Sequence, residues 1–471
     1  MERPLSPPVG AICLPLSLSQ QEVWLDQRAW PGSTHLNIGG AGYIEGPFDL
    51  TIFRRALAIM VAENEALRLA PLLEGGQWLL PEVEAELKIV DLSSAENPKA
   101  AMLEWWQAWM AVPFVLDGRP LWRFALLRHR DDLHGLTIQF HHLIMDGWGT
   151  SQVMQRWAAI YNALAKDDTP VLRNDPGYRQ FIDESLEYRH SAAFEKDAEF
   201  WQAQLPGLPM PLFDRRYPGS PPGLLPMAHL VSHALPRQDY DRLADTAGTL
   251  GATLFGYLIA VLAAYFARAS GRQEIVIGLP TLNRSGKRYR ETFGMFVGVF
   301  PLVVKVLPGM RVQELVISVS VALKAAVRHQ RYPISELARH LEAIRYRRDS
   351  IFDVLFSYER QDYDLNFGAG RSSGSRQAFS GLARYPLGIT LCEFQSNQDA
   401  ELTLEANPAY FSHDEVGFIG RRLAYLMNAM AADPAQLLAE VDWVPPEELS
   451  DLLRAGSGEI CGQPVPEPVF R

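Results

Sequence analysis

One stretch of the sequence constrains the fold more than any other: a strand-like run ends in two adjacent histidines and leads through a short loop into a helical pattern. Residues 133–140 partly alternate in polarity and are rich in apolar side chains, which predicts a strand. Between 153 and 164, apolar residues recur at helical spacing. Because strand and helix patterns occur in both halves of the chain, we predict a mixed α and β fold.

The chain is too long for a single hydrophobic core. It has 471 residues, whereas single cores stop growing at about 250–300 residues, so two domains or two similar lobes are expected. The polar, turn-rich stretch 167–176 is the predicted boundary, and the Gly/Ser-rich stretch 366–381 is predicted to be a surface loop. The most apolar run, 254–266, is shorter than the roughly 20 residues that cross a bilayer and predicts a buried helix.

Charge and cysteine content narrow the class of protein. The formal net charge of -11 disfavours nucleic acid and anionic membrane surfaces as partners, because both select basic faces. Cys13, Cys392 and Cys461 lie far apart and form neither a zinc spacing nor a disulfide framework. The N-terminal residues lack the apolar segment of a signal peptide. We therefore expect a soluble protein of the cytoplasm.

The adjacent histidines are the first candidates for chemistry. Neighbouring residues on a strand point to opposite faces, so at most one of His141 and His142 faces a given cleft. Imidazole suits proton transfer near neutral pH. A carboxylate at Asp146 could orient the histidine or bind a cation elsewhere, and Gly147 could allow a backbone conformation that other residues resist. Each of these residues also fits an ordinary structural role. No metal site is expected, because the two histidines diverge.

The run 141–147, HHLIMDG, matches the HHxxxDG signature of condensation domains from nonribosomal peptide synthetases, which resemble chloramphenicol acetyltransferase. Other segments resemble further motifs of this family in the same order, and the likeness covers roughly residues 14–455. They are SLSQ at 17–20 with Trp24, ENEALR at 63–68, 178–181 with Asp197 and 200–201, IGLPTLNR at 277–284, FGMF at 293–296, HQRYP at 329–333 and IFDVLF at 351–356. Glu63 and Asn64 replace a usual Arg-His pair, and Gly149 stands where Ser is frequent.

The resemblance implies a V-shaped pseudo-dimer of two chloramphenicol acetyltransferase-like lobes around a central tunnel. Its parts would be a lead-in at 1–13, an N-terminal lobe at 14–175, a C-terminal lobe at 176–455 and a linker toward a following domain at 456–471. In the implied reaction, an amine attacks an acyl thioester and yields an amide and a free thiol, without an acyl-enzyme. No permanently bound cofactor is implied.

The same resemblance implies roles for individual residues. His142 is similar to the functional second histidine, which removes a proton from the amine or positions the amine and stabilises the tetrahedral intermediate. His141 would support the loop, and Asp146 would pair with Arg284. The Gly147 amide would donate to the developing oxyanion. We also expect substrate contacts from Trp148, Tyr358 and the basic cluster Arg345, Arg347 and Arg348, although a solvated surface is the alternative for the arginines.

Several subtypes share the signature. No carrier-like segment precedes the first motif, which favours a starter domain that takes its acyl group from coenzyme A and passes it to an aminoacyl group on the phosphopantetheine arm of a carrier. The expected partners are acyl-CoA and downstream adenylation and peptidyl carrier domains, with a monomer as the isolated domain. The alternatives are an elongation domain with a carrier-bound donor, an epimerisation domain, and a noncatalytic recruitment module. The double histidine disfavours the heterocyclisation subfamily, in which an aspartate replaces the first histidine.

Overall fold

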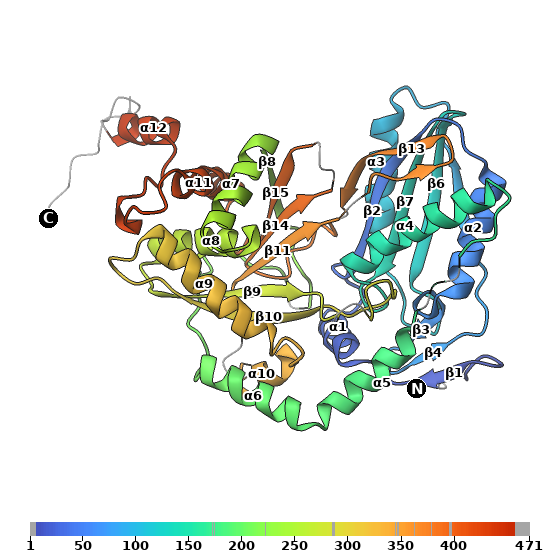
Figure 1. Ribbon diagram of the computed structural model, residues 1–471, viewed down its shortest axis with the longest axis horizontal. Coiled ribbons are helices and arrows are strands. Elements are labelled where there is room, and N and C mark those ends of the chain that lie inside the picture. The colour runs from blue at the N-terminus through green and yellow to red at the C-terminus, as the bar shows by residue number, and fades with distance from the viewer. Residues whose placement is uncertain are drawn as a thin grey trace, which may run out of the picture.

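Two lobes that lean apart in a V are joined at their base (Figure 1). The computed structural model describes residues 6–171, 173, 175–221, 223–284, 288–343, 345, 348–361, 363–377, 379–394 and 398–456. Each lobe is built on a six-stranded mixed sheet with helices packed against it. The predicted mixed fold with two acetyltransferase-like lobes is confirmed.

The sheet of the first lobe has the strand order β12-β13-β2-β7-β6-β5. These strands are β12 (Asn366–Phe367), β13 (Gly370–Gln377), β2 (Asn37–Glu45), β7 (Leu133–His141), β6 (Trp122–Arg130) and β5 (Leu87–Asp91). Helices α2 (Leu50–Glu63) and α4 (Gly147–Leu164) share a core with one face of this sheet, and α3 (Pro98–Met110) packs against the other face. A small sheet of β1 (Ile12–Leu14), β4 (Gln77–Leu79) and β3 (Leu69–Pro71) lies beside them.

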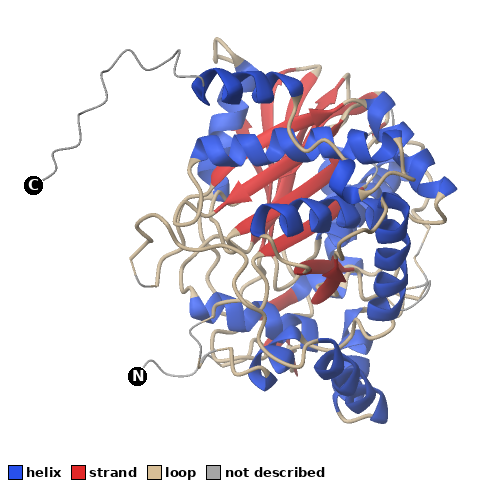
Figure 2. Ribbon diagram, turned by 90° about the vertical axis from the view of Figure 1, so that its left-hand side faces the viewer, coloured by secondary structure: helices blue, strands red, loops and turns tan. Residues whose placement is uncertain are grey.

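The sheet of the second lobe has the order β10-β9-β11-β14-β15-β8. Its strands are β10 (Gly298–Lys305), β9 (Glu274–Thr281), β11 (Val354–Arg360), β14 (Leu387–Glu393), β15 (Ala400–Ala406) and β8 (His229–Leu235). Helices cross its outer face (Figure 2). They are α7 (Arg237–Thr249), α8 (Leu254–Ser270), α9 (Val312–Val327), α11 (His413–Ala432) and α12 (Pro446–Gly456).

The lobes are joined at their base by α1 (Leu18–Ala29), α5 (Tyr178–Arg189), α6 (Ala192–Gln204) and α10 (Ile334–His340) (Figure 1). Ser17 caps α1, because its hydroxyl accepts from the backbone N–H of Gln20. Side chains of α1 contact both lobes. In the first lobe, the Gln20 amide donates to the carbonyl of Leu143 at 3.0 Å. In the second lobe, Glu22 accepts the backbone N–H of Ser335 at 3.1 Å, and Asp26 binds Arg384 at 2.7 Å.

Helix α8 confirms the buried helix predicted at 254–266, because nearly every residue from Gly256 to Ala267 is buried in the second core. Among the described residues, no single helix is long and apolar enough to span a membrane. Helices α7 and α8 would meet that test only as a pair, and the chain bends by 96° between them.

The surface loop predicted at 366–381 is wrong over most of its length. Residues 366–367 and 370–377 form β12 and β13, and β13 pairs antiparallel with β2 in the first sheet. Glycine and serine have low strand propensity, but the edge of β2 offers unpaired backbone groups, and this tertiary pairing overrides the local preference. The predicted second lobe, 176–455, is therefore not continuous in space, because one of its segments completes the first sheet.

Candidate active site

The histidine pair lies where β7 ends and α4 begins, as the sequence predicts. The loop is fixed from its far end by Asp146, the N-cap of α4, which accepts the Gly149 N–H at 2.7 Å. On the strand side, the backbone N–H of His142 donates to the carbonyl of Leu36 at 2.8 Å. Both ends of this short loop are therefore anchored by hydrogen bonds.

His141 points inward and is 1% exposed. The Leu143 N–H donates to its Nδ1 at 3.0 Å, so Nδ1 carries no proton and Nε2–H faces the Gln27 side-chain oxygen at 2.8 Å. Burial, with smaller contributions from His142 and His35, lowers the pKa of His141 to about 3. A neutral ring with both nitrogens bonded has no capacity left for proton transfer, and this geometry fits the supporting role expected for His141.

His142 is half-buried and lines a pocket. Its Nδ1 lies 3.2 Å from Sδ of Met295. A thioether accepts but does not donate, so a hydrogen bond here places the proton on Nδ1 and leaves the Nε2 lone pair available. Burial lowers the pKa of His142, and the negative charge of Asp146 opposes that effect only in part. The ring is therefore biased toward the neutral form, in which it can accept a proton.

Asp146 is fully buried and makes bonds on both carboxylate oxygens. Nη2 of Arg284 lies 2.9 Å from Oδ1 and 3.0 Å from Oδ2, and the Phe296 N–H donates to Oδ2 at 3.0 Å. Nη1 of Arg284 donates in turn to the carbonyls of Tyr289 and Thr292 at 2.8 and 2.6 Å. Asp146 thus ties the loop after β7 to Arg284 and to the backbone of Phe296, and both of its carboxylate oxygens are already hydrogen-bonded.

Gly147 begins α4, so its N–H cannot be bonded within the helix, and it borders the same pocket. The φ of Gly147 is not positive, so the expectation that it provides an unusual backbone conformation is wrong. A Cβ atom here would instead lie 3.4 Å from Oε2 of Glu359 and 3.5 Å from Nε2 of Gln361. Glycine at this position keeps space open between the helix start and these two polar side chains.

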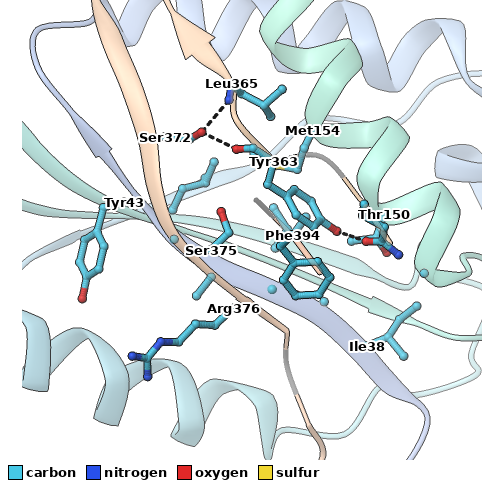
Figure 3. Close-up of a pocket in the computed structure, with 18 of the residues that line it drawn as sticks. Ile38, Tyr43, Thr150, Met154, Tyr363, Leu365, Ser372, Ser375, Arg376 and Phe394 are labelled. Carbon is cyan, nitrogen blue, oxygen red and sulfur yellow. Dashed lines mark hydrogen bonds between the residues drawn. The ribbon is translucent and has the colours of Figure 1, made fainter. Parts of the chain in front are cut away.

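The pocket runs from His142 into the first lobe, between α4, the β2–β7 face and β13 (Figure 3). It encloses about 880 Å³ of empty space, part of which opens to solvent. Gly40 and Gly42 of β2 lie on the same strand face as Ile38 and Ile44 and contribute no side chain, which leaves room for a ligand. Most of one wall is apolar: Ile38, Ile44, Leu136, Ile138, Met154, Leu365 and Phe367.

The opposite wall is polar. Three side chains form a hydrogen-bonded row in which the Tyr363 hydroxyl donates to Gln361 at 2.5 Å and the Gln361 amide donates to Glu359 at 2.9 Å. Tyr363 faces Thr150 and Met154 of α4 across the pocket (Figure 3). The pocket therefore has an apolar interior and a polar rim near His142.

The predicted substrate contacts lie elsewhere. The Trp148 side chain donates to the carbonyl of Arg290 at 2.8 Å, and the Tyr358 hydroxyl bonds to the Tyr240 hydroxyl at 2.5 Å.

Two arginines of the predicted basic cluster are paired with acidic side chains. Arg348 binds Asp353 at 3.0 Å, and the exposed Arg345 binds Glu342 at 2.8 Å. None of these four side chains lines the pocket, and Arg347 lies outside the described residues.

The residues that do line the pocket went largely unnoticed in the sequence. The signal for the cavity was the glycine-rich run 39–42 within a strand, since glycine in a strand frequently marks a ligand approach. The signal for the polar wall was Glu359, a glutamate near the end of a strand that begins with apolar residues. The close approach of the two segments depends on the return of β13 to the first sheet.

Comparisons with known proteins identify the family to which this chain belongs. Residues 12–453 match the family model of the condensation domain. The dimodular nonribosomal peptide synthase of Bacillus subtilis is 28% identical over 92% of this chain, and the isonitrile lipopeptide synthase of Streptomyces coeruleorubidus is 29% identical over 97%. The chain spans only 18% and 30% of these two relatives. This chain therefore belongs to the condensation-domain family, whose members are acyltransferases that form amide bonds.

Solved structures agree with this assignment. The first condensation domain of the calcium-dependent antibiotic synthetase, in complex with a substrate analogue, superposes with a TM-score of 0.81 at 25% identity and covers 92% of this chain and 99% of that one. The starter condensation domain of rhizomide synthetase, in a mutant form bound to C8-CoA, gives a TM-score of 0.82 at 27% identity and covers 92% and 98%.

Proposed function

We propose that this chain is a starter condensation domain, which transfers an acyl group from an acyl-CoA to the amine of an aminoacyl group on a carrier protein. The observation that carries the proposal is the apolar pocket, which begins at His142 and extends beside α4 into the first lobe. An acyl chain in this pocket would bring its thioester to the start of α4. The C8-CoA complex of the rhizomide synthetase domain supports the same donor class.

The site residues divide the reaction between them. The amine attacks the thioester carbonyl, the C–N bond forms and the C–S bond breaks, and the proton leaves the amine for the sulfur. We assign the proton transfer to Nε2 of His142. The Gly147 N–H would donate a hydrogen bond to the oxyanion. Asp146, Arg284 and His141 hold the loop.

The proposed partners follow from the reaction. The acceptor reaches the site on the phosphopantetheine arm of a peptidyl carrier domain, which an adenylation domain loads with an amino acid. Coenzyme A is released as the free thiol. An elongation domain would use the same chemistry, but its donor would be held on an upstream carrier.

A donor comparison tests the proposal. The chain is incubated with an aminoacyl-loaded carrier and either an acyl-CoA series or the same acyl groups on a carrier, and the acyl-aminoacyl carrier is measured by mass spectrometry. We expect product with acyl-CoA. Product with the carrier-bound donor alone would identify an elongation domain, and no amide product with either donor would contradict the proposed function.

Filling the pocket should shorten the preferred donor. Met154 of α4 lines the pocket wall, and the larger side chain in Met154→Trp would occupy the space of several methylene groups. We expect kcat/KM for long acyl chains to fall about 10–200-fold, while the shortest chains remain substrates. Ala159→Trp, on the exposed face of the same helix, is the matched control. An unchanged chain-length profile in Met154→Trp would place the acyl chain elsewhere.

A further inference from the structure

A glutamate of the second lobe reaches the reacting end of the pocket. Side chains alternate along β11, so Val354 and Phe356 enter the second core while Ser357 and Glu359 point to the opposite face. Oε1 of Glu359 accepts the Ser357 hydroxyl at 2.6 Å, and Oε2 accepts the Gln361 amide at 2.9 Å. Oε2 also lies nearest to the position that a Gly147 Cβ would occupy.

The charges around Glu359 are unusual for a desolvated carboxylate. Among the described residues, neither its hydrogen bonds nor the charges that act on it include a lysine, arginine or histidine. Burial and the negative charge of Asp146 raise its pKa. The other titratable groups that face it are His142 across the pocket, Cys392, its partner on β14, and Tyr363.

A carboxylate without a cation lowers stability, because desolvation is not offset by an ion pair. Such an arrangement is typical of a position that is completed by a ligand. Its place beside Gly147 suits a cation that arrives at the reacting carbonyl. The acceptor amine is such a cation, because an α-amino group has a pKa of about 7.7–8.0 and is mostly an ammonium ion at pH 7.

We propose that Glu359 receives the ammonium group of the acceptor and takes one of its protons. The ammonium nitrogen has no lone pair, so it must lose a proton to the carboxylate before it attacks the thioester carbon. The second proton leaves the nitrogen as the C–N bond forms and passes through His142 to the departing sulfur. Two protons leave the nitrogen in all: Glu359 takes the first and returns it to solvent before the next turnover, and His142 takes the second. A neutral imidazole does not attract a cation as a carboxylate does. This inference rests on the amide-forming function proposed above, but not on the donor being acyl-CoA.

The test is the pH profile of Glu359→Gln, which keeps the shape and removes the charge. At pH 6.5, only roughly one α-amino group in 17 to 33 is neutral, for a pKa of about 7.7–8.0. We therefore expect kcat/KM for the acceptor to fall by up to roughly 17- to 33-fold at pH 6.5 and to approach the wild-type value near pH 9, where the free amine is neutral. Glu401→Gln, an exposed glutamate on β15 of the same sheet, is the charge-matched control and should leave the profile unchanged.

A purely structural role would give a different result: the loss in Glu359→Gln would be equal at every pH and the melting temperature would fall. Either that outcome or a wild-type pH profile would overturn the inference. A binding measurement separates this failure from failure of the proposed function. Calorimetry with a nonhydrolysable aminoacyl-pantetheine amide needs no donor. Wild type should prefer it over its N-acetylated form, and Glu359→Gln should lose that preference. Wild type without any preference would also contradict the inference.

Discussion

Replacing His142 by alanine is expected to lower kcat for acyl transfer by about 10²–10⁴, the usual contribution of a positioned acid–base group. The reason is that His142 offers an Nε2 lone pair to the pocket while its Nδ1 is engaged with Met295. Single-turnover kinetics with acyl-CoA and an aminoacyl carrier would measure the loss. The melting temperature and acyl-CoA affinity should change little, because the ring is half-buried and lies at the end of the pocket.

His134, near the start of the strand that leads to His142, provides the control. His134 is also half-buried but does not line the pocket, so His134→Ala should retain nearly the wild-type kcat. A kcat for His142→Ala within a factor of about three of wild type would remove its proposed role in proton transfer.

Replacing Arg284 by methionine should produce the largest change in stability. It would leave the Asp146 carboxylate buried without its cation, and breaking one side of such a pair costs about 3–5 kcal/mol. The guanidinium also donates to two backbone carbonyls and lies 3.9 Å from the centre of the Phe296 ring, so packing is lost as well. Chemical denaturation of the purified variant measures the change in the free energy of unfolding.

A variant of an exposed arginine tests whether burial of the ion pair causes the large loss of stability expected for Arg284→Met. Arg345 pairs with Glu342 at the surface, and Arg345→Met should cost less than about 1 kcal/mol. Adding Asp146→Leu to Arg284→Met should recover only part of the loss, because the Gly149 and Phe296 N–H groups would then lack their acceptor. Equal losses in the two arginine variants would contradict the structural importance of the buried pair.

The sequence was most informative where local pattern and family motif coincide. The strand before the histidines and the helix after them follow from periodicity, and the buried helix α8 follows from its apolar run. The contact between Asp146 and Arg284, 138 positions apart, was reached through the family motif, because no local pattern relates such distant residues.

What the sequence did not reveal depends on long-range geometry. The stretch 366–377 is a strand only because the edge of β2 is available to it. Glu359 acquires its importance from its distance to Gly147, which belongs to the other lobe. Conversely, the basic cluster predicted substrate contacts for Arg345 and Arg348, whereas each of these side chains is paired with an acidic neighbour. Charge clusters in a sequence do not show which of their members are already paired.

We propose that the pocket between α4 and the β2–β13 edge receives the donor acyl chain beside His142. A crystal structure of the protein with a nonhydrolysable acyl-CoA analogue tests it most directly. We predict continuous electron density for the acyl chain between Met154 and Ile138, with the carbonyl oxygen within hydrogen-bonding distance of the Gly147 N–H. An acyl chain bound outside this pocket, with the carbonyl remote from His142 and Gly147, would contradict it.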